Sequence, residues 1–93
     1  MLQQPTAVQA TEGKVLVVDD DGEILSLVAK FLRANGFIVS TARNGAEMKA
    51  QMHSSQVDLV VLDIMLPGTN GLDLCRALRA ESAVPVVMLT AKG

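Results

Sequence analysis

Four aspartates stand directly after apolar segments of the chain. Asp19, Asp20 and Asp21 follow the run KVLVV, and Asp63 follows the run DLVVL. Clustered carboxylates repel one another, so such a group requires either a raised pKa or a bound cation. Carboxylate oxygens at a partly open site suit Mg²⁺, and a carboxylate beside that ion can accept a phosphoryl group. Phosphoryl chemistry at an aspartate is therefore the first hypothesis.

Short apolar runs and helical patterns alternate along the chain and must position these acids. The predicted strands are rich in Val, Ile and Leu and lie at 14–18, 37–42, 58–65 and 84–90. Three segments with helical character lie between them, at 22–36, 44–55 and 72–82. In the first helix the apolar spacing predicts one buried face, made of Ile24, Leu25, Leu27, Val28, Phe31 and Leu32. Asn35 and Gly36 supply its stop signal.

The alternation of strands and helices predicts an α/β fold, a doubly wound parallel sheet with helices on both faces. In such sheets ligands bind beyond the carboxyl ends of the strands. Besides the acids, Thr41 lies near the end of the second strand and Thr90 follows the fourth. If the first and third strands are neighbours, as in a flavodoxin-like 2-1-3-4 order, the carboxylates of Asp19, Asp20 and Asp63 converge.

Composition and charge argue against several other classes of protein. Hydrophobic residues make up 49% of the 93-residue chain, which suits one small domain and excludes a disordered chain. No apolar run has the ~18 residues that a membrane helix needs. The net charge of −2 argues against direct nucleic-acid binding. Residues 1–13 resemble no secretion signal and are expected to form a disordered tail, and the single Cys75 agrees with a reducing cytoplasm.

Three pieces of the sequence together resemble the receiver domain of bacterial two-component response regulators. They are KVLVVDDD, DLVVLDIMLPGTNGLDLCRALR and VPVVMLTAKG, in the family's order and at its separations, from Lys14 to Gly93. MLPGTNG and MLTAKG are most similar to receivers that precede a winged-helix DNA-binding domain. The resemblance implies a receiver at 14–93, acting as a phosphoacceptor in signalling and not as an enzyme. The implied partner is a sensor histidine kinase.

The resemblance also implies roles for individual residues. Asp63 would be the phosphoacceptor, and Asp20 and Asp19 would ligate Mg²⁺ together with Asp63. The backbone carbonyl of Met65 would complete the protein's share of the metal shell, and Thr90 would be the switch hydroxyl. Pro67 and Gly71 would shape the loop after the third strand. Asp21, directly before GEIL, is expected to cap the first helix.

The resemblance covers a receiver without its usual fourth helix, fifth strand and fifth helix. The family's lysine and aromatic switch residue lie on that part and have no counterpart here, and Lys92 belongs to the loop after strand four. The expected consequence is a fragment of a longer protein in which strand four is an exposed apolar edge. Such a chain, made alone, is expected to be marginally stable or to self-associate.

Two other functions remain open on the residues. One is a receiver-like interaction module that is never phosphorylated. The other is a haloacid-dehalogenase-like phosphatase, whose nucleophile and second aspartate could be Asp19 and Asp21. In that case Gly22 stands where a hydroxyl residue is usual, and Asp63 is left unexplained.

Overall fold

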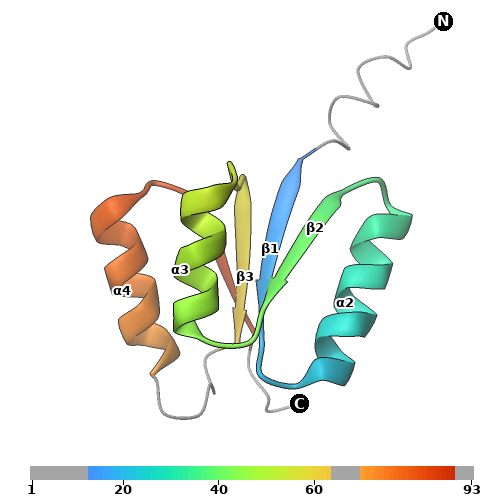
Figure 1. The fold of residues 1–93 in the computed structure, drawn as a ribbon, viewed down its shortest axis with the longest axis horizontal. Helices are drawn as coiled ribbons and strands as arrows, with labels where there is room; N and C mark the ends of the chain where they lie inside the picture. Colours follow the sequence, from blue (N-terminus) through green and yellow to red (C-terminus); the bar gives the residue numbers. More distant parts are fainter. Residues whose placement is uncertain (1–12, 64–69, 90–93) are drawn as a thin grey trace, which may run out of the picture.

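The strands and helices alternate as the apolar pattern predicts. The computed structural model describes residues 13–63 and 70–89. The elements are β1 (Lys14–Val18), α2 (Gly22–Ala34), β2 (Ile38–Ala42), α3 (Gly45–Ser54), β3 (Leu59–Asp63), α4 (Gly71–Glu81) and β4 (Val86–Leu89). Figure 1 shows the sheet between α2 on one side of the view and α3 and α4 on the other. No helix within the described residues is long and apolar enough to cross a membrane.

The four strands form one parallel sheet in the order β2-β1-β3-β4, which confirms the predicted 2-1-3-4 order. β1 and β3 are the inner strands, and their register pairs Val15 with Leu59 and Val18 with Leu62. Both inner strands are buried on both faces, as their nearly continuous apolar sequence requires. Gly13, predicted to belong to the tail, joins this folded part, because its carbonyl accepts the N–H of Ile38 at 3.0 Å.

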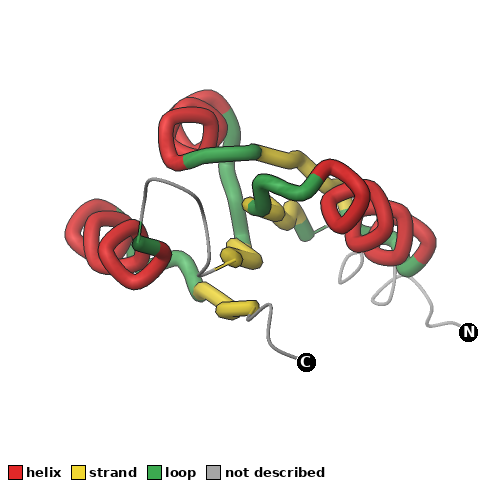
Figure 2. The backbone as a smooth tube through the Cα atoms, turned by 90° about the horizontal axis from the view of Figure 1, so that it is seen from below, coloured by secondary structure: helices red, strands yellow, loops and turns green. Residues whose placement is uncertain are grey.

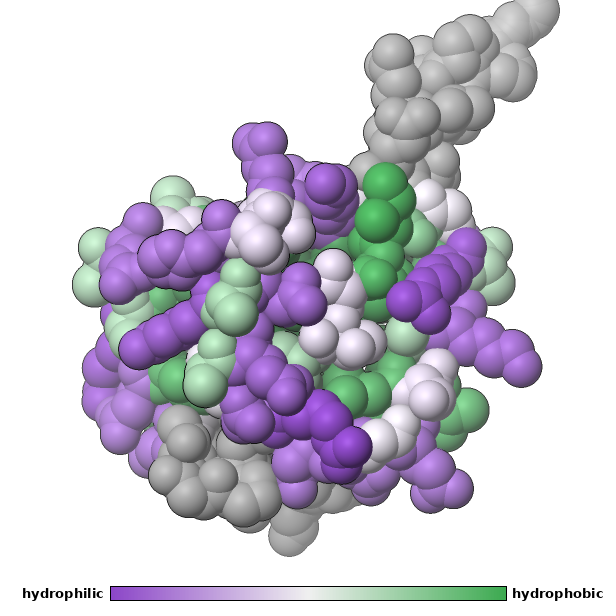
Figure 3. Space-filling view, in the orientation of Figure 1, coloured by the Kyte–Doolittle hydropathy of each residue, from purple (hydrophilic) through white to green (hydrophobic). Residues whose placement is uncertain are grey.

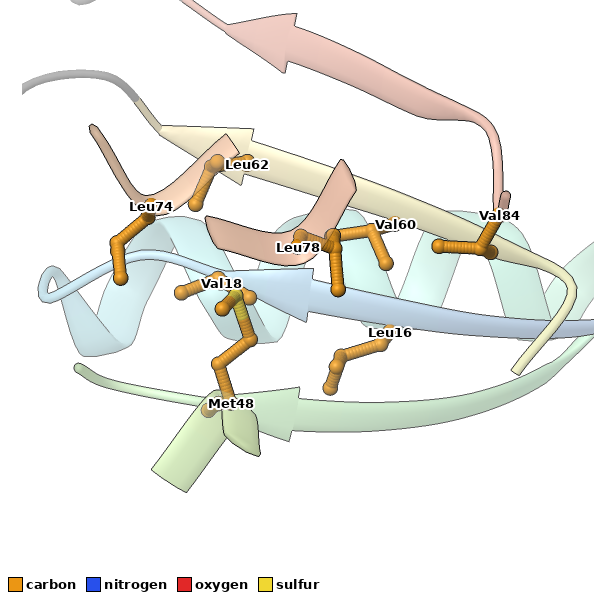
Figure 4. Close-up of a cluster of buried hydrophobic side chains, with 9 residues drawn as sticks. Leu16, Val18, Met48, Val60, Leu62, Leu74, Leu78 and Val84 are labelled. Carbon is orange, nitrogen blue, oxygen red and sulfur yellow. The ribbon is translucent and has the colours of Figure 1, made fainter. Parts of the chain in front are cut away.

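Helices cover both faces of the sheet, as Figure 2 shows, with α3 and α4 on one face and α2 on the other. The core under α3 and α4 is the larger one (Figure 4) and contains Leu16, Val18, Ala42, Met48, Val60, Leu62, Leu74, Leu78 and Val84. The core under α2 contains Val15, Val17, Leu25, Ala29, Val39 and Val61. On the solvent side of α3 and α4, hydrophilic residues dominate the view in Figure 3.

The predicted buried face of α2 is partly wrong. Leu25 and Ala29 are buried, whereas Leu27 and Phe31 are 67% and 66% exposed, and Ile24 is exposed as well. A single helix touches a sheet along a narrow stripe, so apolar residues on its flank stay buried only if another element lies alongside. Within residues 13–63 and 70–89, no element covers that flank of α2.

The ends of the helices follow local capping chemistry. α2 ends before Asn35, and Gly36 adopts a φ of 91°, the left-handed conformation that glycine tolerates best. Asn44 and Asn70, which the sequence reasoning passed over, are the N-caps of α3 and α4. Because the Asn70 side chain accepts the N–H of Leu72, α4 begins at Gly71, one residue before the predicted start.

Candidate metal and phosphoacceptor site

Three carboxylates meet at the carboxyl end of the two inner strands. Asp19 directly follows Val18, the last residue of β1, and Asp63 is the last residue of β3, directly after the Leu62 that pairs with Val18. One carboxylate oxygen from each of Asp19, Asp20 and Asp63 lies within 4.8 Å of the others. The predicted convergence therefore exists, and it depends on β1 and β3 being neighbours in the sheet.

Burial distinguishes the three acids. Asp19 is only 4% exposed and Asp63 only 7%, and they are the two buried charged side chains among the described residues. Asp20 is the more open member of the group. Burying a carboxylate destabilises the folded state unless the group is paired, protonated or bound to a cation. Apolar packing alone therefore does not explain why Asp19 and Asp63 are buried.

The pKa of Asp19 is raised, mainly because burial penalises its charged form. The backbone N–H of Asp21 donates to Asp19 Oδ1 at 2.9 Å and opposes that shift. The charge of Asp63, a hydrogen bond shared with its carboxyl group, and the charge of Asp20 raise the pKa further. A divalent cation would relieve these repulsions, and three carboxylate oxygens form the hard donor set that Mg²⁺ prefers.

Asp21 faces away from this group despite its place in the same run. Its Oδ1 accepts the N–H groups of Glu23 at 2.9 Å and Ile24 at 3.4 Å, so Asp21 is the N-cap of α2. The run of three acids thus divides into two residues at the candidate site and one helix cap.

The structure describes two of the remaining candidate residues, Gly71 and Thr41. Gly71 is buried in the first turn of α4, so it belongs to the helix and not to the loop that was predicted to end with it. Met65, Pro67 and Thr90 lie outside the described residues. Thr41 is exposed near the end of the edge strand β2.

The protein belongs to the response regulator receiver domain family, whose model matches residues 15–93. It is 42% identical to the transcriptional regulatory protein ResD of Bacillus subtilis, over 91% of this chain and 35% of ResD. It is 47% identical to the DNA-binding response regulator MtrA of Mycobacterium tuberculosis, over 85% of this chain and 35% of MtrA. The chain thus spans about a third of the length of these relatives.

Solved receivers share the fold. The BeF3-activated receiver domain of Klebsiella pneumoniae RstA matches with a TM-score of 0.81 and 37% identity, covering 87% of this chain and 69% of that one. The Thermotoga maritima response regulator TrrA, solved in complex with Mg²⁺-BeF, matches with a TM-score of 0.80 and 35% identity, covering 87% and 71%.

Proposed function

We propose that this chain receives a phosphoryl group on Asp63 from a histidine of a sensor kinase. In that step the P–N bond to the donor imidazole breaks as a P–O bond forms to a carboxylate oxygen of Asp63. The observation that carries the proposal is the convergence of Asp19, Asp20 and Asp63 within 4.8 Å at the ends of β1 and β3. Family membership supports the same role, which is that of a signalling domain.

Asp19, Asp20 and Asp63 are the described residues that would hold Mg²⁺. Bound there, the ion would neutralise charge that develops on the phosphoryl oxygens. Asp19 and Asp20 offer negative charge, which attracts the cation, and burial of Asp63 limits competing water. The Met65 carbonyl as a further ligand, the Thr90 hydroxyl as the switch, and the shaping of the loop by Pro67 remain proposals from the resemblance.

The wider setting follows from the relatives. MtrA is named a DNA-binding response regulator and ResD a transcriptional regulatory protein. We propose that this receiver likewise controls a DNA-binding output, of the winged-helix type, in the cytoplasm. Because its net charge is −2, the receiver segment itself is not expected to bind DNA.

The structure weighs against the phosphatase alternative. That reading needs Asp21 beside Asp19 as a second catalytic acid, yet the Asp21 carboxylate is engaged by the first turn of α2. It also leaves the buried Asp63 without a role. An interaction module that is never phosphorylated stays as the second candidate, and the following experiment separates it from the first.

The test is phosphorylation by acetyl phosphate with Mg²⁺, read by intact-mass spectrometry on this chain and on a version extended to full receiver length. We expect one added phosphoryl group, lost in Asp63→Ala and kept in Asp73→Ala, which removes an exposed acid of α4. Modification of the longer version alone would show that phosphorylation of Asp63 needs the residues that the extension adds. If neither version is modified, the phosphoacceptor role is rejected in favour of the interaction module.

Self-association through β4 is a further proposal for the 93-residue chain made alone. β4 lies at one edge of the described sheet, and Val87 on it is 48% exposed. An apolar edge strand offers unpaired backbone groups to another chain. We expect concentration-dependent assembly in analytical ultracentrifugation, and we expect Val87→Lys to reduce it.

Ile38→Lys is the matched control for that measurement. Ile38 is 50% exposed on β2, the opposite edge strand, where the Arg33 guanidinium already donates to the Val39 carbonyl at 3.1 Å. The control should therefore assemble like the parent chain. A monomer at all concentrations, or equal effects of the two lysines, would contradict assembly through β4.

A further inference from the structure

Two connecting segments meet beside the three-carboxylate group of Asp19, Asp20 and Asp63. One is the loop from β1 to α2, which carries Asp19, Asp20 and Asp21, and the other joins β2 to α3. Both lie at the lower end of the sheet in Figure 1. The N–H of Asp19 donates to the carbonyl of Ala42, the last residue of β2, at 3.0 Å. The end of β2 therefore supports the loop that carries two of the three acids.

Arg43 is the first residue of the connection from β2 to α3, and its side chain reaches the same loop. Its Nη2 donates to the carbonyl of Asp20 at 2.9 Å. Its guanidinium also lies over Gly22, the first residue of α2, where an added Cβ would be 3.8 Å from Nη1. The guanidinium thus contacts the residues on both sides of Asp21.

The backbone of Arg43 is itself held by the start of α3. Its N–H donates to Glu47 Oε1 at 2.8 Å, and Glu47 lies in the first turn of that helix. Asn44, directly after Arg43, is the N-cap of α3, and its side chain accepts the N–H of Glu47 at 2.8 Å. These two bonds fix the entry to α3, so the arginine side chain extends from a backbone that is tied to a helix.

Asp20 is the acid that depends most on such support. Asp19 is buried, and its carboxylate accepts the N–H of Asp21, whereas Asp20 is the more open member of the group. The bond from Arg43 ends on the main chain of Asp20. A carboxylate oxygen of the same residue lies within 4.8 Å of oxygens of Asp19 and Asp63. A residue that fixes the backbone of a ligand also limits where its carboxylate can lie.

We propose that Arg43 is a positioning residue for the cation site, because it holds the main chain of Asp20 so that its carboxylate can bind Mg²⁺ with Asp19 and Asp63. This inference rests on the proposed function, since it concerns the same ion. The direction of the effect separates positioning from charge. Removing a positive charge near three carboxylates strengthens cation binding, whereas loss of positioning weakens it.

The test is a Mg²⁺ titration of the full 93-residue chain, followed by amide NMR shifts. Arg43→Gln should weaken Mg²⁺ binding about tenfold. That is the lower end of the ~10–100-fold loss typical when a partner of a metal ligand is removed, and it suits an exposed arginine. Arg43→Lys keeps a charged donor and should bind Mg²⁺ more tightly than Arg43→Gln.

Arg33→Gln is the matched control. Arg33 lines the same groove between α2 and β2 as Arg43, and its Nη2 likewise donates to a main-chain carbonyl, that of Val39, at 3.1 Å. Val39 pairs with Val15 near the start of β1, whereas the acids follow the other end of that strand. The control removes the same charge and the same kind of bond, and it should bind Mg²⁺ like the parent.

Amide hydrogen exchange in Mg²⁺-free buffer reports on the positioning itself. The N–H of Asp21 donates to Asp19 Oδ1 at 2.9 Å within the loop, so a looser loop opens this bond more often. Arg43→Gln should therefore speed exchange of the Asp21 amide, and Arg33→Gln should leave its rate unchanged.

Equal or tighter Mg²⁺ binding by Arg43→Gln would overturn the positioning role and leave the cation site intact. So would an Arg33→Gln variant that binds as weakly as Arg43→Gln, or an Asp21 amide that exchanges at the parent rate in Arg43→Gln. A parent chain that does not bind Mg²⁺ would overturn the cation site, and the positioning role with it.

Discussion

A magnesium titration is expected to raise the melting temperature of the chain. A ligand that binds only the folded state at about 100 times its Kd stabilises by about 2.7 kcal/mol, or roughly 10–20 °C for a small domain. The reason is relief of repulsion among Asp19, Asp20 and Asp63. The chain has no Trp or Tyr, so unfolding is followed by circular dichroism or calorimetry.

Asp19→Asn gives that prediction a distinctive signature. The folded state raises the pKa of Asp19, so the unfolded state releases this proton first as the pH rises. The metal-free parent therefore loses stability as the pH climbs from the ordinary aspartate range through the raised pKa. Without metal at neutral pH, Asp19→Asn should melt higher than the parent, yet its response to Mg²⁺ should be smaller.

The exposed Asp73 supplies the matched control. Asp73→Asn changes the net charge equally, removes only a surface ion pair, and should keep the full Mg²⁺ response. Equal Mg²⁺ responses in the parent and in Asp19→Asn would contradict binding at the three-carboxylate group.

Leu16→Ala is expected to cost about 2–5 kcal/mol of unfolding free energy, the range for truncating a buried leucine. Leu16 is fully buried in the centre of β1, under α3 and α4. A domain of this size typically has only ~5–15 kcal/mol to lose. Urea unfolding followed by circular dichroism at 222 nm measures the loss.

Leu27→Ala makes the same truncation where the side chain is 67% exposed, on the outer flank of α2. It should stay within ~0.5 kcal/mol of the parent. Comparable losses in Leu16→Ala and Leu27→Ala would mean that the flank of α2 is covered in solution, for example by a second copy of the chain.

Several parts of the fold are readable from single residues and their neighbours. The continuous apolar run of β1 indicates a strand buried on both faces, and Gly36 marks the end of α2. The place of Asp63 at the end of β3 is equally local. The neighbours of a strand are not local, however, because periodicity alone does not say that β3 lies beside β1. Family resemblance supplied that order, and the pairing of Val18 with Leu62 confirms it.

What the sequence reasoning missed depends on tertiary packing. The exposure of Leu27 and Phe31 reflects which elements flank α2, and a helical pattern cannot report that. Arg33 and Arg43 look like ordinary surface residues in the sequence. They line one groove only because α2 packs across β2. Asn44 and Asn70 carried a readable signal, since asparagine directly before a glycine that opens a helix is a favoured N-cap.

The places of Asp19 and Asp63 have a consequence for local unfolding. Asp19 follows the inner strand β1 and Asp63 ends the inner strand β3, whereas β2 and β4 lie at the edges of the described sheet. Segments with fewer packed neighbours open first, and the most enclosed strands open last, close to the global transition. Fraying of β4 removes Leu89, the strand partner of Asp63, but it leaves the pairing of Val18 with Leu62, which holds the ends of β1 and β3 together.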